Sequence, residues 1–232
     1  MEYKVWYNYL LFRLGLRKVL PKKIISNVKI EENNEELVMV DSNRFIFDDM
    51  IEKPVYLRKS VYDKLCVFDE IVKEKSYKIK LFDAYRSIDK QKEVWLQALD
   101  ETKKENPNAN EEEIIRITTL KVANPTSGIG GHQTGGAIDI TLLDKDGNEL
   151  DMGSKYLEHI PQTKTYCKDI NDVQKSNREY LLKNLEKLGF VNFPTEWWHY
   201  CYGDKMWAAY SNKKTCMYGY VEPKVKVKEL KR

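Results

Sequence analysis

The chain lacks several residue patterns that identify common protein classes. Its four cysteines, Cys66, Cys167, Cys201 and Cys216, include no Cys-x-x-Cys pair, which argues against a cysteine zinc site and against a dithiol redox motif. We expect free thiols in a reducing compartment, although spacing alone leaves two disulfides open. Only three histidines occur among 232 residues, so a site built from imidazole has few candidate ligands.

Neither sign of charge dominates, and no apolar run is long enough to span a bilayer. Against 36 acidic residues there are 39 basic ones, a net charge of +3 that gives no reason to expect nucleic acid as a partner. Residues 3–20 are rich in aromatics and leucine, but charges interrupt them and no small-residue cleavage site follows. We expect an amphipathic helix packed on the domain here; a helix on a membrane surface is the less favoured alternative. Because no export signal is recognisable, the cytoplasm is the expected location.

Length and composition predict one domain of ordinary size. A hydrophobic share of 42%, with 12% aromatic residues, is enough for a core. We place this domain at residues 28–220, after an N-terminal amphipathic segment at 1–27 and before a basic tail at 221–232.

Hydrophobic periodicity predicts an alternation of strands and helices. Period-two patterns predict strands over residues 28–30, 37–40, 78–86, 136–142 and 195–202. Helical spacing predicts helices that begin at Ser60 and at Ser87, one around 114–120, and one over 173–189. Residues 100–113 are expected to be a solvated connection.

The stretch from Gly131 to Leu142 is the first candidate site. In the predicted strand, Asp139 lies on the face opposite its apolar neighbours, and the glycines around His132 allow a sharply bent backbone. A histidine on such a turn and an aspartate seven residues later can converge, and imidazole with carboxylate suits zinc. Taken alone, a hydrogen-bonding histidine and a surface aspartate are at least as plausible, so a third ligand is needed.

The third ligand is offered by Glu196-Trp197-Trp198-His199. Strict strand alternation would send Glu196 and His199 to opposite faces, so a shared site requires Glu196 to lie in the turn ahead of the strand. The competing interpretation is a buried histidine among aromatics beside an exposed glutamate. Arg86, at a predicted strand end, could stabilise a developing negative charge, although most arginines only make surface contacts.

Taken together, these residues predict a catalytic zinc centre, one per chain. His132, Asp139 and His199 would be the ligands and leave the fourth position open, as in catalytic rather than structural sites. Zinc lowers the pKa of its water to about 7. Glu196 would accept the proton of that water and pass it to the leaving amine, and Arg86 would stabilise the oxyanion.

The same residues carry a family resemblance. The chain resembles the zinc D,D-peptidases, specifically the D-alanyl-D-alanine dipeptidases of the vancomycin-resistance type, whose signature is His-x6-Asp followed by Glu-x-x-His. The similarity runs from about Asp49 to Trp207, with anchors at Asp83-Ala84-Tyr85-Arg86, His132 to Leu142, Asp151-Met152-Gly153, Asn177-Arg178 and Glu196-Trp197-Trp198-His199.

This resemblance implies a single α+β domain with a central antiparallel sheet flanked by helices. It assigns His132, Asp139 and His199 to zinc, Glu196 to acid–base catalysis and Arg86 to transition-state stabilisation. It also implies a small D-amino-acid dipeptide, D-Ala-D-Ala or a close peptidoglycan-derived relative, as the substrate. The sequence does not predict an oligomeric state.

Three positions depart from the family pattern. Ser87 stands where proline is common, glycines at 130 and 131 stand where a serine often precedes the metal histidine, and Tyr156-Leu157-Glu158 replaces an aromatic-Asp-Glu run. The last two are expected to alter the pocket and to leave the zinc ligands unchanged. A zinc D,D- or L,D-carboxypeptidase acting on longer cell-wall peptides is therefore the nearest alternative. A non-catalytic binding module is less favoured, because it has no need of all five residues.

Overall fold

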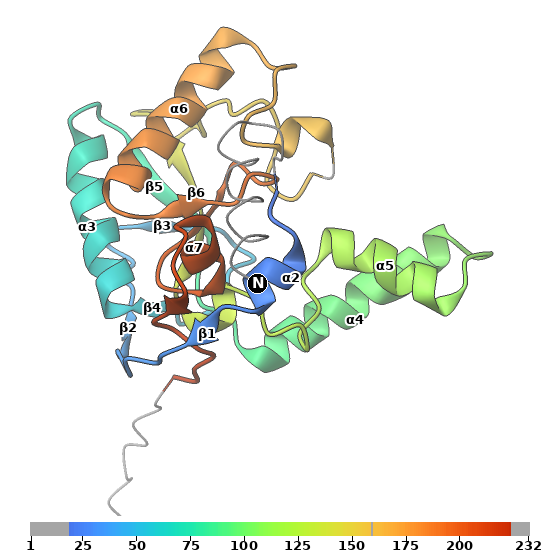
Figure 1. The fold of residues 1–232 in the computed structure, drawn as a ribbon. Coiled ribbons are helices and arrows are strands. Elements are labelled where there is room, and N and C mark those ends of the chain that lie inside the picture. Colours follow the sequence, from blue (N-terminus) through green and yellow to red (C-terminus); the bar gives the residue numbers. More distant parts are fainter. Residues whose placement is uncertain (1–18, 159, 224–232) are drawn as a thin grey trace, which may run out of the picture.

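The computed structural model describes residues 19–158 and 160–223 (Figure 1). The predicted amphipathic helix at residues 3–20 lies almost entirely outside these ranges, as does His159. None of the helices within them has the length and apolar character needed to cross a membrane.

A five-stranded sheet organises the fold, in the order β3-β5-β6-β8-β7. Its strands are β3 (Ile46–Phe47), β5 (Lys78–Asp83), β6 (Ala137–Leu143), β7 (Val191–Asn192) and β8 (His199–Cys201). The four strands from β5 to β7 pair antiparallel, which confirms the expected antiparallel centre, and β3 adds a parallel edge. Two small two-stranded sheets pair β1 (Lys29–Ile30) with β9 (Thr215–Cys216) and β2 (Leu37–Met39) with β4 (Tyr56–Arg58).

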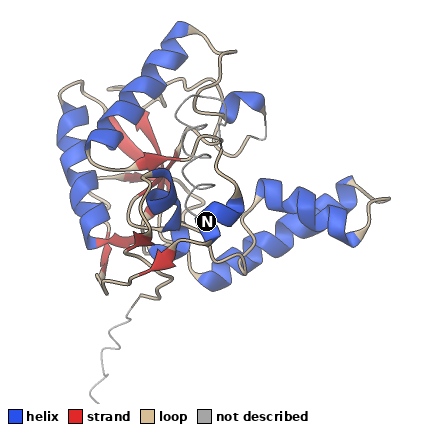
Figure 2. Cartoon of the chain, in the orientation of Figure 1, coloured by secondary structure: helices blue, strands red, loops and turns tan. Residues whose placement is uncertain are grey.

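Helices cover both faces of this sheet (Figure 2). Those in the described ranges are α2 (Lys22–Ser26), α3 (Lys59–Lys73), α4 (Ile88–Glu105), α5 (Glu111–Lys121), α6 (Asp172–Lys187) and α7 (Lys205–Tyr210). The main core joins the apolar stripes of α3 and α6 to one face of β6, which contributes Ile138, Ile140 and Leu142. A second cluster packs α2 and α7 against Ala137 and Cys201. Because side chains alternate along a strand, Asp139 lies on the same face of β6 as Ala137.

Several predicted element boundaries are wrong. The strand predicted over residues 195–202 is limited to β8, which begins at His199 and ends at Cys201. Ser60 does not cap α3, which begins one residue earlier; its backbone N–H instead donates to the carboxylate of Glu35 from a separate segment. The strand predicted to reach Arg86 ends at Asp83, next to an irregularity in its pairing with β6. Beyond that point the backbone bonds elsewhere, since the N–H of Tyr85 donates to Tyr56.

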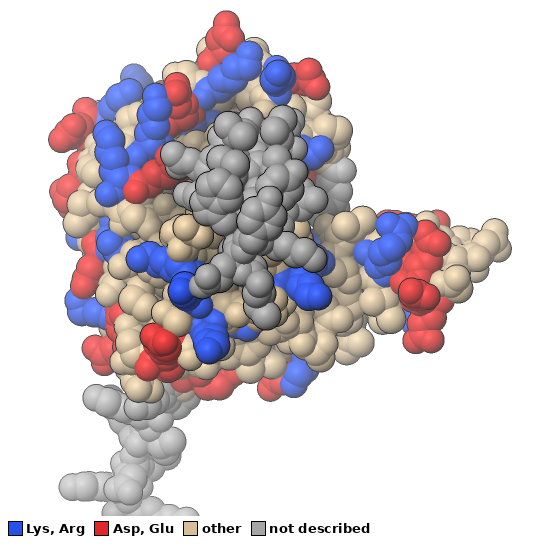
Figure 3. All heavy atoms as spheres, in the orientation of Figure 1, with Lys and Arg blue, Asp and Glu red and all other residues tan. Residues whose placement is uncertain are grey.

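The predicted solvated connection at residues 100–113 is partly helical, because α4 continues to Glu105 and buries Thr102. With α5 it forms a helical hairpin that projects from the body of the protein (Figure 1). Figure 3 shows basic and acidic residues mixed on this hairpin, and ion pairs such as Lys104–Asp100 lie along it. The hairpin leads the chain away from the sheet and returns it to the glycine-rich turn before His132.

Candidate metal centre

Strand register places three polar side chains in one row. Asp139 on β6 lies directly opposite His199 on β8 and opposite Asp83 on β5. Directly opposed residues point to the same face of a sheet. The row is therefore a product of backbone pairing, and it lies on the face away from the core formed with α3 and α6.

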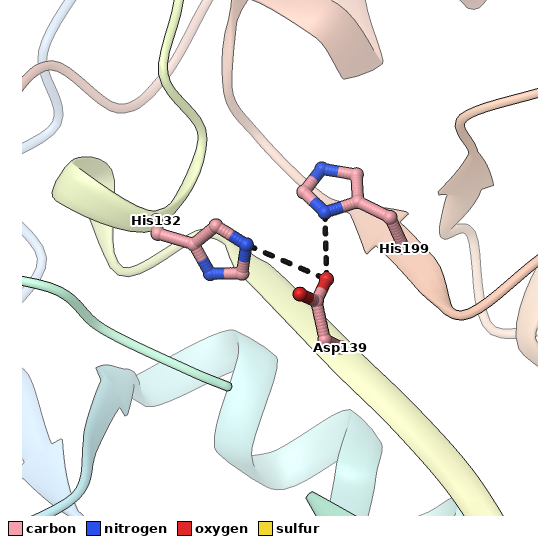
Figure 4. Close-up of side chains that lie close together, drawn as sticks. All are labelled: His132, Asp139 and His199. Carbon is pink, nitrogen blue, oxygen red and sulfur yellow. Dashed lines mark hydrogen bonds and ion pairs between the residues drawn. The ribbon is translucent and has the colours of Figure 1, made fainter. Parts of the chain in front are cut away.

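The third candidate ligand, His132, lies outside the sheet. His132 begins a 3-10 turn, η1 (His132–Thr134), that leads into β6. Its Nε2 lies 3.4 Å from Oδ1 of Asp139, and Nδ1 of His199 lies 2.7 Å from the same oxygen. Figure 4 shows both rings directed at this carboxylate. Ligand atoms of the three buried residues all lie within 4.8 Å of one another, a grouping able to hold one metal ion.

Each imidazole has its other ring nitrogen engaged. Nδ1 of His132 lies 2.6 Å from the carbonyl oxygen of Ala84, so it donates there and leaves Nε2 for a metal. Nε2 of His199 lies 3.2 Å from Sγ of Cys201, on the side of the ring away from Asp139. Cys201 is buried in the second apolar cluster, and the structure places it beside His199 as a hydrogen-bond partner of the ring.

Charge in the cluster favours a bound cation. Burial disfavours the His132 imidazolium, but the carboxylates of Asp83 and Asp139 outweigh this and raise its pKa to about 9. Burial also opposes ionisation of Asp139, yet His132 and His199 hold the pKa of that carboxyl far below its usual range. Two nitrogens and one carboxylate oxygen in a buried, negatively polarised site are a fitting ligand set for Zn²⁺.

Glu196 lies in the turn before β8, where a role beside the metal requires it. Its backbone N–H donates to Phe193, and its carbonyl accepts from the N–H of His199. Burial raises the pKa of its carboxyl, and the positive charges of His199, His132 and Arg86 partly oppose that rise. A glutamate with a raised pKa near two imidazoles is suited to accept and return a proton at neutral pH.

Arg86 follows β5 by three residues and joins the same electrostatic neighbourhood. Its backbone N–H donates to the carbonyl of His132 over 3.3 Å, and its guanidinium pairs with Asp83. Burial opposes the charge of Arg86, but the carboxylates of Asp83 and Asp139 raise its pKa, so it stays positive. The structure thus brings all five predicted site residues to one region.

Sequence reasoning connected Tyr156 with the pocket but not with Asp139, which it contacts in the structure. Its hydroxyl donates to Oδ2 of Asp139 over 2.9 Å, and its ring stacks on Phe82 at 4.3 Å. This contact leaves Oδ1 to face the histidines. An aromatic residue at position 156 fits the family pattern and could have suggested a place at the site, but its contact with Asp139 on β6 is visible only in the folded structure.

The glycine that replaces a family serine has a local physical reason. A Cβ at Gly131 would lie 2.5 Å from Oδ2 of Asp204 and 2.9 Å from Cβ of Ala137. Both neighbours are buried, so position 131 has no room for a side chain. The space that a serine side chain would use is occupied by Asp204, the N-cap residue of α7, and by Ala137 of β6.

A buried site of two histidines and one aspartate, with a glutamate and an arginine beside it, defines the chain as a zinc metallopeptidase. The model of the peptidase M15 family, described as D-ala-D-ala dipeptidase, matches residues 50–218. The chain belongs to this family.

Two dipeptidase sequences agree with this membership. The chain is 32% identical over 181 residues to a D-alanyl-D-alanine dipeptidase of Synechocystis sp., covering 64% of this chain and 71% of the relative. It is 28% identical over 159 residues to one of Escherichia coli, covering 66% and 72%. Among solved structures, VanYB in complex with D-Alanine-D-Alanine is 15% identical with a TM-score of 0.49, over 81% of this chain and 89% of that one.

Proposed function

We propose that this protein is a zinc-dependent dipeptidase that hydrolyses D-Ala-D-Ala, or a closely related peptidoglycan-derived dipeptide, to free D-amino acids. The observation that carries the proposal is the buried group of His132, Asp139 and His199, whose ligand atoms lie within 4.8 Å of one another, in a chain of the D-Ala-D-Ala dipeptidase family. We further propose the cytoplasm as its location, where such a dipeptide would be a free small molecule.

Each site residue has a proposed role. Zn²⁺ held by His132, Asp139 and His199 would lower the pKa of its water ligand to about 7 and polarise the scissile carbonyl. Glu196 accepts a proton from the attacking water and delivers it to the leaving amine, for which its raised pKa suits it. Arg86 donates hydrogen bonds to the oxyanion, a role in which one donor is typically worth about 3 kcal/mol.

The test is D-alanine release by the zinc-loaded protein from free D-Ala-D-Ala and, in parallel, from a pentapeptide that ends in D-Ala-D-Ala. Glu196→Gln serves as the control, because it keeps the shape of the side chain and removes the proton acceptor. Exposed Glu179→Gln on α6 is the matched variant that should keep full activity.

Release from the dipeptide alone, abolished by Glu196→Gln but not by Glu179→Gln, supports the proposal. Release only from the pentapeptide would reassign the protein as a carboxypeptidase and point to the altered 156–158 run. If neither substrate is cleaved although zinc is bound, the proposed substrate is wrong.

A further inference from the structure

Gln91, in the first turn of α4, is buried beside Arg86 and was assigned no role by the sequence. Only 2% of it is exposed. Its Oε1 accepts from Nη1 of Arg86 over 2.9 Å and from Nε2 of Gln133 over 2.8 Å. Its Nε2 donates to the carbonyl of Ala123 over 2.7 Å. One amide therefore joins the catalytic arginine, the turn that carries His132 and the returning end of the helical hairpin.

These contacts fix the orientation of the Gln91 amide. Two donors converge on its oxygen, and a carbonyl faces its nitrogen, so a flipped amide would place like groups against each other at all three contacts. The backbone N–H of Gln91 also donates to the carbonyl of Ser87, the N-cap residue of α4. The side chain is thus attached to a rigid helix start and has a single satisfied arrangement.

Arg86 needs such a partner, because among the described residues Asp83 is the other side chain that its guanidinium bonds, and the group could turn about that single contact. Asp83 takes Nη2, and Gln91 takes Nη1. Two acceptors at different nitrogens define the plane of the fork. Since Gln91 is neutral, it orients the guanidinium without cancelling its charge, which a second carboxylate would do.

Gln133 extends this link to the metal centre. It follows His132 directly and donates to the same Gln91 oxygen that receives Arg86. We propose that Gln91 is a positioning residue, which holds the Arg86 guanidinium in a fixed relation to His132 and anchors both to the α4–α5 hairpin. This inference rests on the proposed function, in which Arg86 stabilises the oxyanion.

The test compares Gln91→Leu with Gln97→Leu in the zinc-loaded full chain. Gln97 is an exposed glutamine on the same helix, so its replacement controls for the loss of a polar side chain from α4. We expect Gln91→Leu to lower kcat by about 10- to 100-fold, because small misplacements of catalytic groups have effects of this size. KM and the zinc content should stay within about twofold of the unaltered protein, since a transition-state contact is what is lost.

A double-mutant cycle with Arg86→Ala separates this inference from the proposed function. If Gln91 acts through Arg86, Gln91→Leu lowers kcat in the unaltered protein and has little further effect in Arg86→Ala. Additive losses, or full activity in Gln91→Leu while Arg86→Ala is slow, overturn the positioning role and leave the proposed function standing. Full activity in Arg86→Ala overturns the proposed role of the arginine itself.

Gln91→Met covers the case in which the leucine variant does not fold. Its unbranched side chain is close to glutamine in length and fills the same space without the amide, so we expect a loss of kcat like that of Gln91→Leu and little further effect in Arg86→Ala. Full activity in Gln91→Met while Arg86→Ala is slow would contradict the inference.

Discussion

The candidate metal centre combines two regions that hold its residues by different means. Asp139 and His199 lie opposite each other on β6 and β8, so backbone pairing fixes their spacing before any side chain is considered. His132 and Arg86 lie outside regular strands, and scattered contacts hold them: the carbonyl of Ala84, the side chain of Asp83 and the amide of Gln91. We call Asp139 and His199 the sheet half of the site and His132 and Arg86 the loop half. The sheet half is robust because many backbone hydrogen bonds support it, whereas the loop half depends on a few polar side chains.

Breaking the sheet half should have the largest effect. In Asp139→Ala the two imidazoles lose the carboxylate between them, so we expect the protein to purify with far less than one zinc per chain. D-Ala-D-Ala hydrolysis should fall by more than about 1000-fold, beyond what loss of a single oxyanion donor causes. Metal analysis and D-alanine release measure both. Exposed Asp146→Ala, in the neighbouring turn, is the control, and equal zinc content in the two variants would refute the ligand assignment.

The loop half can be broken from a distance, at Arg58. This side chain is 1% exposed, and its Nε donates to the carbonyl of Thr134 in η1 over 2.8 Å. It also donates to Gly219 and pairs with Glu32. Arg58→Met should lower the free energy of unfolding by about 3 kcal/mol, because it leaves buried carbonyls without donors.

Urea unfolding measures this loss of stability. We expect a lower urea concentration at the unfolding midpoint and an unchanged dependence of the free energy of unfolding on urea concentration. Exposed Arg116→Met, which removes a surface pair with Glu113, should change stability by less than about 1 kcal/mol. Similar losses in the two variants would mean that Arg58 does not secure the turn.

Lowering the pH tests His132 of the loop half, because protons and zinc compete for the histidines. With the pKa of His132 raised to about 9, this residue carries a proton at neutral pH in the metal-free protein, and zinc must displace it. Zinc affinity should therefore fall by about tenfold per pH unit for each proton released as pH decreases below 9. Calorimetry in buffers of different ionisation enthalpy counts the protons. An affinity independent of pH between 7 and 8.5 would contradict the charge balance described here.

The smallest expected effect is at Cys201, the partner of His199. Cys201→Ser keeps an acceptor for Nε2 of the ring, whereas Cys201→Ala removes it. We expect the alanine variant to bind zinc about tenfold more weakly, the lower end of the range for outer partners of metal ligands, and the serine variant to bind nearly as well as the unaltered protein. Competition with a chromogenic chelator measures both. Cys66→Ala, distant on α3, should change nothing.

The local sequence pattern was sufficient to predict how the strands place the residues of the sheet half. Alternation placed Asp139 opposite the core face of its strand. The strand predicted over 195–202 is shorter in the structure, and Glu196 lies ahead of it, where a site shared with His199 requires it to be. Four of the predicted helices are present in the structure, although Ser60 does not begin α3 and α4 runs past residue 100.

Local sequence patterns could not predict contacts between residues that lie far apart in the chain. Neither periodicity nor capping rules connect Gln91 with Gln133, or Arg58 with Thr134, because these pairs meet only after the sheet has formed. The early end of β5 has the same origin: the carbonyl of Ala84 accepts from His132 instead of extending the ladder. Family resemblance supplied the roles of the ligands, but it did not supply the residues that orient them.

The position of β6 in the middle of the sheet bears on how the metal would leave. Every residue of this strand is buried, and it is paired on both sides, so its amide hydrogens should exchange only when the whole domain opens. The η1 turn lacks such pairing and can open by a smaller fluctuation. The rate of zinc release to a chelator should then equal the opening rate of the η1 turn. Asp139 and His199 would keep their positions on the strands and could bind the next ion.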